Sequence, residues 1–204
     1  MRSVILLLVA AAPVLLIAGC DKPSAPQGQA NETTEPSLDE AANMAPATAP
    51  APDNGVDVIG KLDRKHAGET APSATFTKPD GSEGRLAAYA GKPFVLNLWA
   101  TWCAPCKAEM PTLEKIAREG KIPVVTISQD TEGSIGQVVP FFAAQKFTAL
   151  QANTDKDLKF ALALNNPQMP TTILYDSSGK EVWRMAGGMD WTSPTARELL
   201  AEAK

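Results

Sequence analysis

Apolar residues dominate two short segments in the second half of the chain. Phe94–Trp99 reads FVLNLW and Ile122–Ile127 reads IPVVTI, a pattern typical of strands buried on both faces. Pro123 lies at the start of the second segment, where a strand loses no ladder hydrogen bond. Between the two, Ala104–Glu119 has apolar residues at helical spacing and is followed by Gly120, so we expect a helix that ends there.

The rest of this region alternates between helical and extended patterns. Thr171–Tyr175 and Glu181–Met185 are rich in β-branched and large apolar residues and predict a hairpin that turns at Ser177–Lys180. A short strand is expected near Phe76, before a turn at Pro79-Asp80-Gly81. Three helices and one short extended segment complete the prediction, the helices at about 134–146, 155–164 and 193–203 and the extended segment at 149–152. Strands separated by helices imply crossover connections, hence an α/β fold with a mixed sheet covered on both faces.

Residues 1–20 have the pattern of an export signal. Arg2 precedes an apolar run, Val4–Ala18, and small residues follow it. The run is shorter than the roughly 20 residues that span a bilayer. Ile17–Cys20 resembles the bacterial lipobox, in which the cysteine is lipidated and becomes the first mature residue. We therefore predict a signal peptide over 1–19 and lipidation of Cys20; an ordinary signal peptide that contains a cysteine is the alternative.

Residues 20–70 differ in composition from the remainder of the chain. Up to Asp57 this stretch is rich in proline and acidic residues with one basic residue, Lys22, and the first aromatic residue of the chain is Phe76. Such a segment buries too little apolar area to offset its ordering entropy. We expect a disordered tether over 20–70, spanning roughly 40 Å on average, and a folded domain over 71–204. Asp21 resembles the inner-membrane retention signal of enteric bacteria and favours that membrane.

Composition excludes several classes of function. The net charge is −4, and acids and bases balance over residues 71–204, so the domain has no basic surface for a nucleic-acid partner. His66 is the single histidine, which excludes most histidine-based catalysis and most zinc sites. Three cysteines are too few for a disulfide scaffold.

Cys103 and Cys106 lie where the strand Phe94–Trp99 gives way to the following helix. Cys103 is at the first turn, where unpaired backbone N–H groups and the helix dipole favour a thiolate. The thiolate is the form that attacks a disulfide, so this position predicts that Cys103 is the nucleophile. Cys106 lies one turn deeper, within reach of a disulfide with Cys103, and Pro105 is tolerated in the first turn. Trp102 adds apolar bulk that limits the access of water.

A half zinc site and a structural disulfide are the alternatives for this CxxC. Zinc takes about four ligands, and the chain offers no second CxxC and only His66. A disulfide over so short a loop constrains the unfolded chain little, and a structural disulfide does not need a helix N-terminus. A redox-active pair fits the position better than either alternative.

The segment Trp99–Pro111, WATWCAPCKAEMP, resembles the active site of thioredoxin-fold proteins and, more narrowly, of the TlpA/ResA-like thiol-disulfide oxidoreductases. Met169-Pro170-Thr171 stands where that family has its cis-proline loop. The spacing from Cys103 to Pro170 exceeds the minimal thioredoxin spacing, which resembles the subfamily's central insertion and places it around 145–166. Gly187–Trp191 resembles the family's approach to its last helix. The resemblance covers about 71–204 and implies a thioredoxin-like fold with a central mixed sheet flanked by helices, a central insertion and an N-terminal hairpin extension.

The resemblance also implies roles for individual residues. Cys103 would attack the substrate disulfide and Cys106 would resolve the mixed disulfide. Pro170 would lie in cis beside the pair, and the backbone of Met169 would hold a substrate strand by β-type hydrogen bonds. Together with Trp102, these two residues form the predicted substrate-binding set.

Glu109 is the candidate acid/base. It follows Cys106 by three residues, about one helical turn, so the two side chains can be neighbours. Minimal thioredoxins carry a buried aspartate at the position of Asn97, and an amide cannot take up a proton. The family's active-site glutamate matches Glu109, which would then exchange the Cys106 proton. A solvated acid on the helix surface is the alternative.

By resemblance, the chain is a membrane-tethered dithiol reductase of protein disulfides, monomeric, at the periplasmic face of a bacterial membrane. No cofactor or metal is expected beyond the cysteine pair. The family implies a membrane electron donor that draws on cytoplasmic thioredoxin, and clients such as apocytochrome c or copper-site proteins of oxidase assembly. A thiol oxidase or isomerase is the first alternative, since it differs in potential rather than fold. A copper-delivery protein is the second, although it would be expected to carry CxxxC and a distal histidine.

Overall fold

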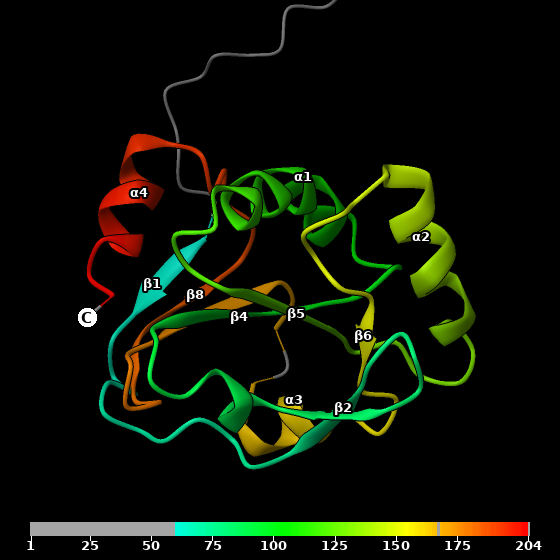
Figure 1. Ribbon diagram of the computed structural model, residues 1–204, viewed down its shortest axis with the longest axis horizontal. Helices are drawn as coiled ribbons and strands as arrows, with labels where there is room; N and C mark the ends of the chain where they lie inside the picture. Colours follow the sequence, from blue (N-terminus) through cyan, green and yellow to red (C-terminus); the bar gives the residue numbers. More distant parts are fainter. Residues whose placement is uncertain (1–59, 167, 204) are drawn as a thin grey trace, which may run out of the picture. The chain divides into compact units, whose positions relative to one another are not determined.

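The computed structural model describes residues 60–166 and 168–203 (Figure 1). The described strands are short except for those at the centre of one sheet. In chain order the elements are β1 (Lys61–Asp63), β2 (Thr75–Thr77), β3 (Glu83–Arg85), the 3-10 helix η1 (Leu86–Tyr89), β4 (Phe94–Trp99), α1 (Ala104–Glu119), β5 (Val124–Ser128), the 3-10 helix η2 (Ile135–Gln137), α2 (Val138–Gln145), β6 (Asn153–Thr154), α3 (Lys159–Ala163), β7 (Thr171–Tyr175), β8 (Glu181–Ala186) and α4 (Pro194–Leu200).

The strands form one mixed sheet in the order β1-β8-β7-β4-β5-β6-β2-β3, with β1 and β3 at its edges. β4 pairs in parallel with β5 and antiparallel with β7. The parallel pair needs a crossover connection, which α1 supplies. The expected hairpin is β7 and β8, and the expected N-terminal hairpin extension is β2 and β3. This arrangement confirms the thioredoxin-like α/β fold with a mixed sheet between helices.

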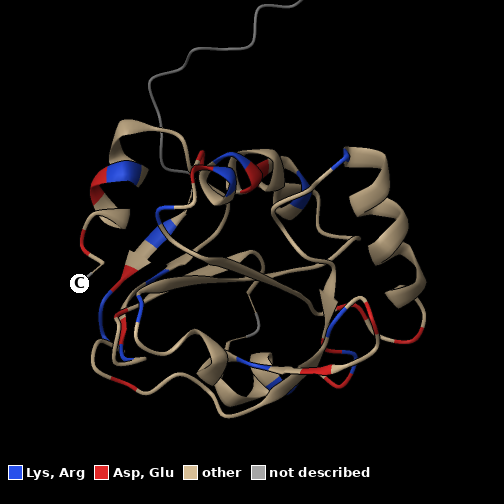
Figure 2. Ribbon diagram, viewed as in Figure 1, with Lys and Arg blue, Asp and Glu red and all other residues tan. Residues whose placement is uncertain are grey.

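Helices cover both faces of the sheet, with α1, α2 and α4 on one face and α3 on the other (Figure 1). Side chains alternate along β4, so Val95 and Trp99 pack with Met110 and Leu113 of α1. The intervening Leu96 and Leu98 belong to the second core, which includes Phe160 of α3. By the same alternation Asn97 faces α1. Lys and Arg are interspersed with Asp and Glu along the ribbon, while α2 carries no charged residue (Figure 2).

The helix α1 has the predicted bounds because both of its ends have the expected local chemistry. Cys103 is the N-cap, and its sulfur accepts a hydrogen bond from the backbone N–H of Cys106 at 3.3 Å. Pro105 lies in the first turn, where it displaces no helical hydrogen bond. Gly120 closes the helix in the left-handed conformation, with φ of 67°. No helix among the described residues has the length and apolarity needed to cross a membrane.

The extended segment predicted at 149–152 is wrong, because β6 occupies Asn153–Thr154 instead. The carboxylate of Glu114, on α1, accepts the backbone N–H groups of Thr148, Ala149 and Leu150 at 2.9–3.2 Å. These N–H groups are therefore not available to a β-ladder, and pairing with β5 begins only at Asn153.

The helix predicted at 155–164 starts later, at Lys159. Leu158 adopts a left-handed conformation with φ of 57°, which interrupts a helix at that point. The side chain of Asp155 accepts the N–H of Phe160 at 2.8 Å and so takes the place of a helical turn. β6 and α3 together fill the stretch where the central insertion is expected.

Two other helices differ from the prediction at their ends. The helix predicted at 134–146 begins as η2 and becomes α-helical at Val138, with Pro140 in the first turn of α2, where a missing N–H costs nothing. The terminal helix predicted at 193–203 is capped by Ser193, whose hydroxyl accepts the N–H of Ala196, and ends at Leu200.

The folded domain begins before the predicted boundary at residue 71. β1 pairs antiparallel with β8, and Thr70 bridges to Lys180. A Cβ at Gly60 would lie 2.8 Å from the carbonyl oxygen of Gly187, so the chain is closely packed there from the first described residue. The sequence Lys-Leu-Asp of β1 has no apolar pattern, because an edge strand of three residues buries little. The predicted signal peptide, Cys20 and the tether as far as residue 59 lie outside the described residues.

Candidate functional site

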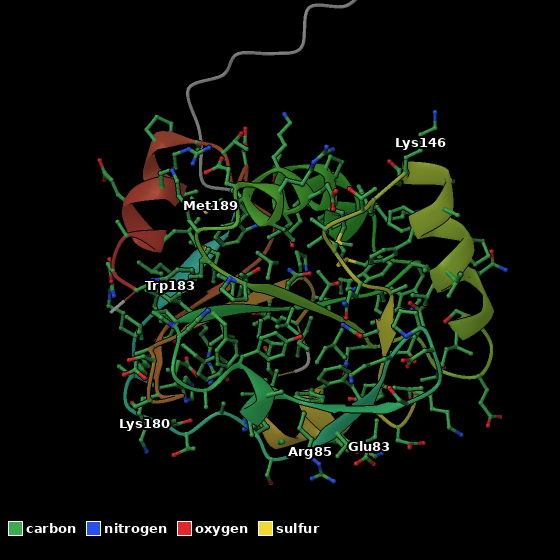
Figure 3. The ribbon with its side chains drawn as sticks, viewed as in Figure 1. Glu83, Arg85, Lys146, Lys180, Trp183 and Met189 are labelled. Carbon is green, nitrogen blue, oxygen red and sulfur yellow. A yellow bond between two sulfur atoms is a disulfide. The ribbon has the colours of Figure 1, made fainter. Side chains whose placement is uncertain are left out.

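The cysteines of the CxxC motif form a disulfide at the start of α1, drawn as a yellow bond in Figure 3, with an S–S distance of 2.04 Å. The two residues differ in exposure: Cys103 is 6% exposed and Cys106 is fully buried. Trp102, directly before Cys103, is 63% exposed. An approaching thiol or disulfide therefore meets Cys103, with an indole ring beside it, and cannot reach Cys106 directly.

The predicted proline loop lies next to this turn of α1. The peptide bond between Met169 and Pro170 is cis. The carbonyl oxygen of Pro170 accepts the N–H of Gly187 at 2.8 Å, and a Cβ at Gly188 would lie 3.5 Å from the carbonyl oxygen of Pro105. The connection after β8 thus contacts both the loop before β7, through Gly187, and the CxxC turn, through Gly188.

Glu109 is buried behind the disulfide, with 4% of its surface exposed, so the alternative of a solvated surface acid is wrong. Its Oε1 accepts a hydrogen bond from Asn97 Nδ2 at 2.8 Å. Its Oε2 accepts two more, from the backbone N–H of Met189 and from Trp191 Nε1, each at 3.1 Å. Met189, labelled in Figure 3, and Trp191 belong to the connection between β8 and α4.

Burial raises the pKa of Glu109 to about 7, because the ionised carboxylate loses its hydration. The hydrogen bonds from Trp191, Asn97 and Met189 act in the opposite direction and offset only part of this effect. A carboxyl group with such a pKa can gain or lose a proton near neutral pH, which a surface glutamate cannot do.

Sequence reasoning did not assign Trp191, Met189 or Thr172 to this site. Thr172 Oγ1 accepts the second hydrogen bond of the Asn97 amide at 2.9 Å, while Asn97 Oδ1 has no partner among the described residues. The motif Gly187–Trp191 was the available signal, since it is part of the family resemblance. Its role follows only from the contacts, because the donors lie about eighty residues from Glu109 in the chain.

The described residues contain no group of three His, Cys, Asp or Glu side chains that could hold a metal ion. His66 lies in the turn after β1, where its Nδ1 is 3.0 Å from Glu69 Oε1. The chemical groups that meet at the start of α1 are thus a cysteine pair, a buried carboxyl and a proline loop.

Comparisons with known proteins agree with this arrangement. Residues 66–200 match the family model described as Redoxin. The chain is 34% identical over 122 residues to the thiol-disulfide oxidoreductase ResA of Geobacillus kaustophilus, covering 60% of this chain and 70% of that protein. The exposed lipoprotein thioredoxin Etrx1 of Streptococcus pneumoniae superposes with a TM-score of 0.56 at 26% identity, over 64% of this chain and 99% of that chain. A thio-disulfide isomerase of Thermus thermophilus gives a TM-score of 0.52 at 29% identity, over 68% and 98%. With a redox disulfide at the start of α1 and relatives of this kind, the chain belongs to the redoxin family and is a thiol-disulfide oxidoreductase.

Proposed function

We propose that the chain is a membrane-tethered dithiol reductase of protein disulfides that acts outside the cytoplasm. The observation that carries the mechanism is the buried carboxyl of Glu109, one helical turn after Cys106 and with a pKa near 7. It is the group suited to take a proton from a cysteine that solvent does not reach. The exposed indole of Trp102 and the loop Met169–Pro170 flank the pair and would contact the client chain.

The reaction starts from the reduced pair. The Cys103 thiolate attacks one sulfur of the client disulfide, a mixed disulfide forms, and the first client sulfur leaves as a thiolate that takes a proton from water. Cys106 then gives its proton to Glu109 and attacks the Cys103 sulfur. The mixed disulfide breaks, the second client sulfur leaves as a thiolate that takes a proton from water, and the Cys103–Cys106 disulfide of the structure forms. The client gains two electrons and the pair loses two.

Burial of Cys106 makes an internal base necessary for the second half of this cycle. Cys106 has no exposed surface, so its thiol cannot pass a proton directly to solvent. With its pKa raised to about 7, Glu109 can be ionised near neutral pH, and in that form it can accept the proton. Substrate binding by the Met169 backbone follows from the family resemblance, in which a client strand adds to this loop by β-type hydrogen bonds.

Two observations support the proposed location, the sequence of residues 1–20 and the name of one relative. The apolar run ends at Cys20 in a lipobox-like motif, and one solved relative is named an exposed lipoprotein. An anchored protein in an oxidising compartment needs electrons to stay reduced, and a membrane dithiol donor is the source that the family implies. Apocytochrome c and proteins of oxidase assembly are the proposed clients of a monomeric enzyme.

Trapping tests this function. A Cys106→Ser variant should stop at the mixed disulfide on Cys103, so that client and donor proteins are recovered from an envelope fraction as covalent adducts that dithiothreitol releases. The matched Cys103→Ser variant lacks the attacking sulfur and should trap neither. Equal adducts from both variants would contradict the assigned order of attack. A reduction potential far above about −200 mV would favour the oxidase or isomerase alternative.

A further inference from the structure

Asp130 is a buried carboxylate that the reaction described above does not use. It lies shortly after the end of β5, and its side chain has no exposed surface. Its Oδ1 accepts a hydrogen bond from Thr101 Oγ1 at 2.6 Å; its Oδ2 accepts from Thr101 N at 2.9 Å and from Ser128 Oγ at 2.6 Å. The donors lie at the ends of β4 and β5, which meet because Trp99 and Ser128 are partners in the parallel register.

Thr101 belongs to the turn that leads from β4 to the attacking cysteine. The turn is closed by a hydrogen bond from Cys103 N to the carbonyl oxygen of Ala100 at 3.1 Å. Within the described part of the chain, Asp130 supplies the side-chain oxygen that accepts the Thr101 N–H. The carboxylate therefore fixes backbone that lies two residues from Cys103.

The charge of Asp130 is not balanced by a cation. No Lys, Arg or His side chain in residues 60–166 and 168–203 forms an ion pair with it. A second buried acid, Asp155, accepts a hydrogen bond at 3.3 Å from Nε2 of Gln129, the residue before Asp130. It adds a second negative charge. On α1, Lys107 is exposed and Glu109 faces the connection after β8. Buried charges are screened little by salt, so a carboxylate here opposes a second negative charge nearby.

We propose that Asp130 is a positioning residue of the redox centre, which fixes the turn from Thr101 to Cys103 and, through its charge, disfavours the Cys103 thiolate. The proposal rests on the proposed function, in which Cys103 is the attacking sulfur. A stabilised thiolate makes the reduced pair more stable and the disulfide a stronger oxidant. An opposing charge has the reverse effect, and so Asp130 keeps the pair a reductant.

The variant Asp130→Asn tests the charge on the full-length chain. The alkylation rate of Cys103 as a function of pH, read by mass spectrometry of its own peptide, gives the thiol pKa without interference from Cys20. We expect this pKa to fall by about half a unit to one unit. Equilibration with glutathione should show an equilibrium constant for reduction of the disulfide that is larger by about three- to tenfold, and tenfold corresponds to about 30 mV.

Thr101→Val is the matched control, because it removes one hydrogen bond from the carboxylate and keeps the charge. The less compensated charge should raise the thiol pKa, opposite to the effect of Asp130→Asn. A purely structural role would lower the melting temperature of both variants and leave the thiol pKa and the equilibrium constant unchanged, and that result overturns the proposal.

If Asp130→Asn does not fold, Thr101→Val alone tests the proposal. A raised pKa of the Cys103 thiol in this variant supports it, and an unchanged or lowered pKa overturns it. Both readouts use glutathione or an alkylating agent rather than a client protein. Failure of the reductase function in trapping is therefore distinguishable from failure of this proposal.

Discussion

Glu109→Gln removes a titratable group from the buried network behind Cys106 and keeps its shape. A glutamine oxygen can accept the two hydrogen bonds that Glu109 Oε2 now receives from Met189 and Trp191. Its new amide nitrogen then faces Asn97, whose Oδ1 has no partner in the described part of the chain and can accept from it if the amide rotates. The substitution therefore isolates the loss of the proton from a loss of packing.

The effect on stability has a defined sign and size. The folded-state pKa of Glu109 is about 7 and the ordinary value is 4.5, so folding favours the protonated form. Ionised Glu109 thus destabilises the fold, by an amount that grows as pH rises from 4.5 and levels off above 7. At 1.36 kcal/mol per pKa unit, this cost is under about 1 kcal/mol at pH 5 and about 3 kcal/mol at pH 8. The free energy of unfolding of Glu109→Gln, relative to that of the wild type, should therefore be larger at pH 8 than at pH 5.

Activity should change in the opposite direction. Without a group to take the Cys106 proton, attack on the mixed disulfide should slow by about 10²-fold, the lower end of the range for general acid/base catalysis. The pH dependence of this step should lose its transition near pH 7. A variant that is more stable at pH 8 and yet slower in the attack on the mixed disulfide would show that the buried acid contributes to the reaction and not to the stability of the fold.

Two measurements check this pair of effects. Urea unfolding of both proteins at pH 5 and pH 8 gives the difference in the free energy of unfolding, and stopped-flow fluorescence follows resolution of a mixed disulfide with a model peptide. The reasoning is refuted if the stability difference between the two proteins is the same at both values of pH. It is also refuted if resolution keeps the wild-type rate and pH profile.

Three further predictions concern other parts of the chain. Asn97→Leu removes a hydrogen bond that stabilises ionised Glu109, so the pH at which the rate of attack on the mixed disulfide changes should move up by about one unit. An unchanged pH profile would show that Asn97 does not set the pKa of Glu109. Glu114→Ala leaves the N–H groups of 148–150 without their acceptor and should cost about 2–3 kcal/mol in urea unfolding, with a smaller loss for Glu114→Gln. Cys20→Ser should move the protein from the membrane pellet to the soluble envelope fraction, and retention in the pellet would contradict lipid anchoring.

The elements that position the disulfide were predictable because their signals are local. An apolar run typical of a strand buried on both faces identified β4, and apolar residues at helical spacing with a closing glycine identified α1. The predicted extended segment at 149–152 was wrong because the competing acceptor, Glu114, comes from a different helix. The residues of the segment itself contain no pattern that indicates this competing hydrogen-bond acceptor.

The site shows the same division between local and distant contacts. The cysteine pair and Glu109 lie within seven residues, so motif and helical spacing place them together. Trp191 and Asp130 reach the site from beyond the ends of β8 and β5, through contacts that depend on strand order. Gly187–Trp191 matches a family motif and Asp130 has no such signal, but in both cases only the folded arrangement of the sheet shows which groups these side chains contact.

The short strands at the two edges of the sheet bear on how this enzyme can handle its clients. Thiol-disulfide oxidoreductases meet protein chains with exposed cysteines, and incompletely folded chains tend to add as extra strands to open sheet edges. β3 is three residues long and presents the ion pair Glu83–Arg85, both residues labelled in Figure 3, and β1 carries Lys61 and Asp63. Short, charged edges of this kind resist strand addition. A client is thus discouraged from sticking where no chemistry occurs, and the enzyme can release it once its disulfide has been exchanged.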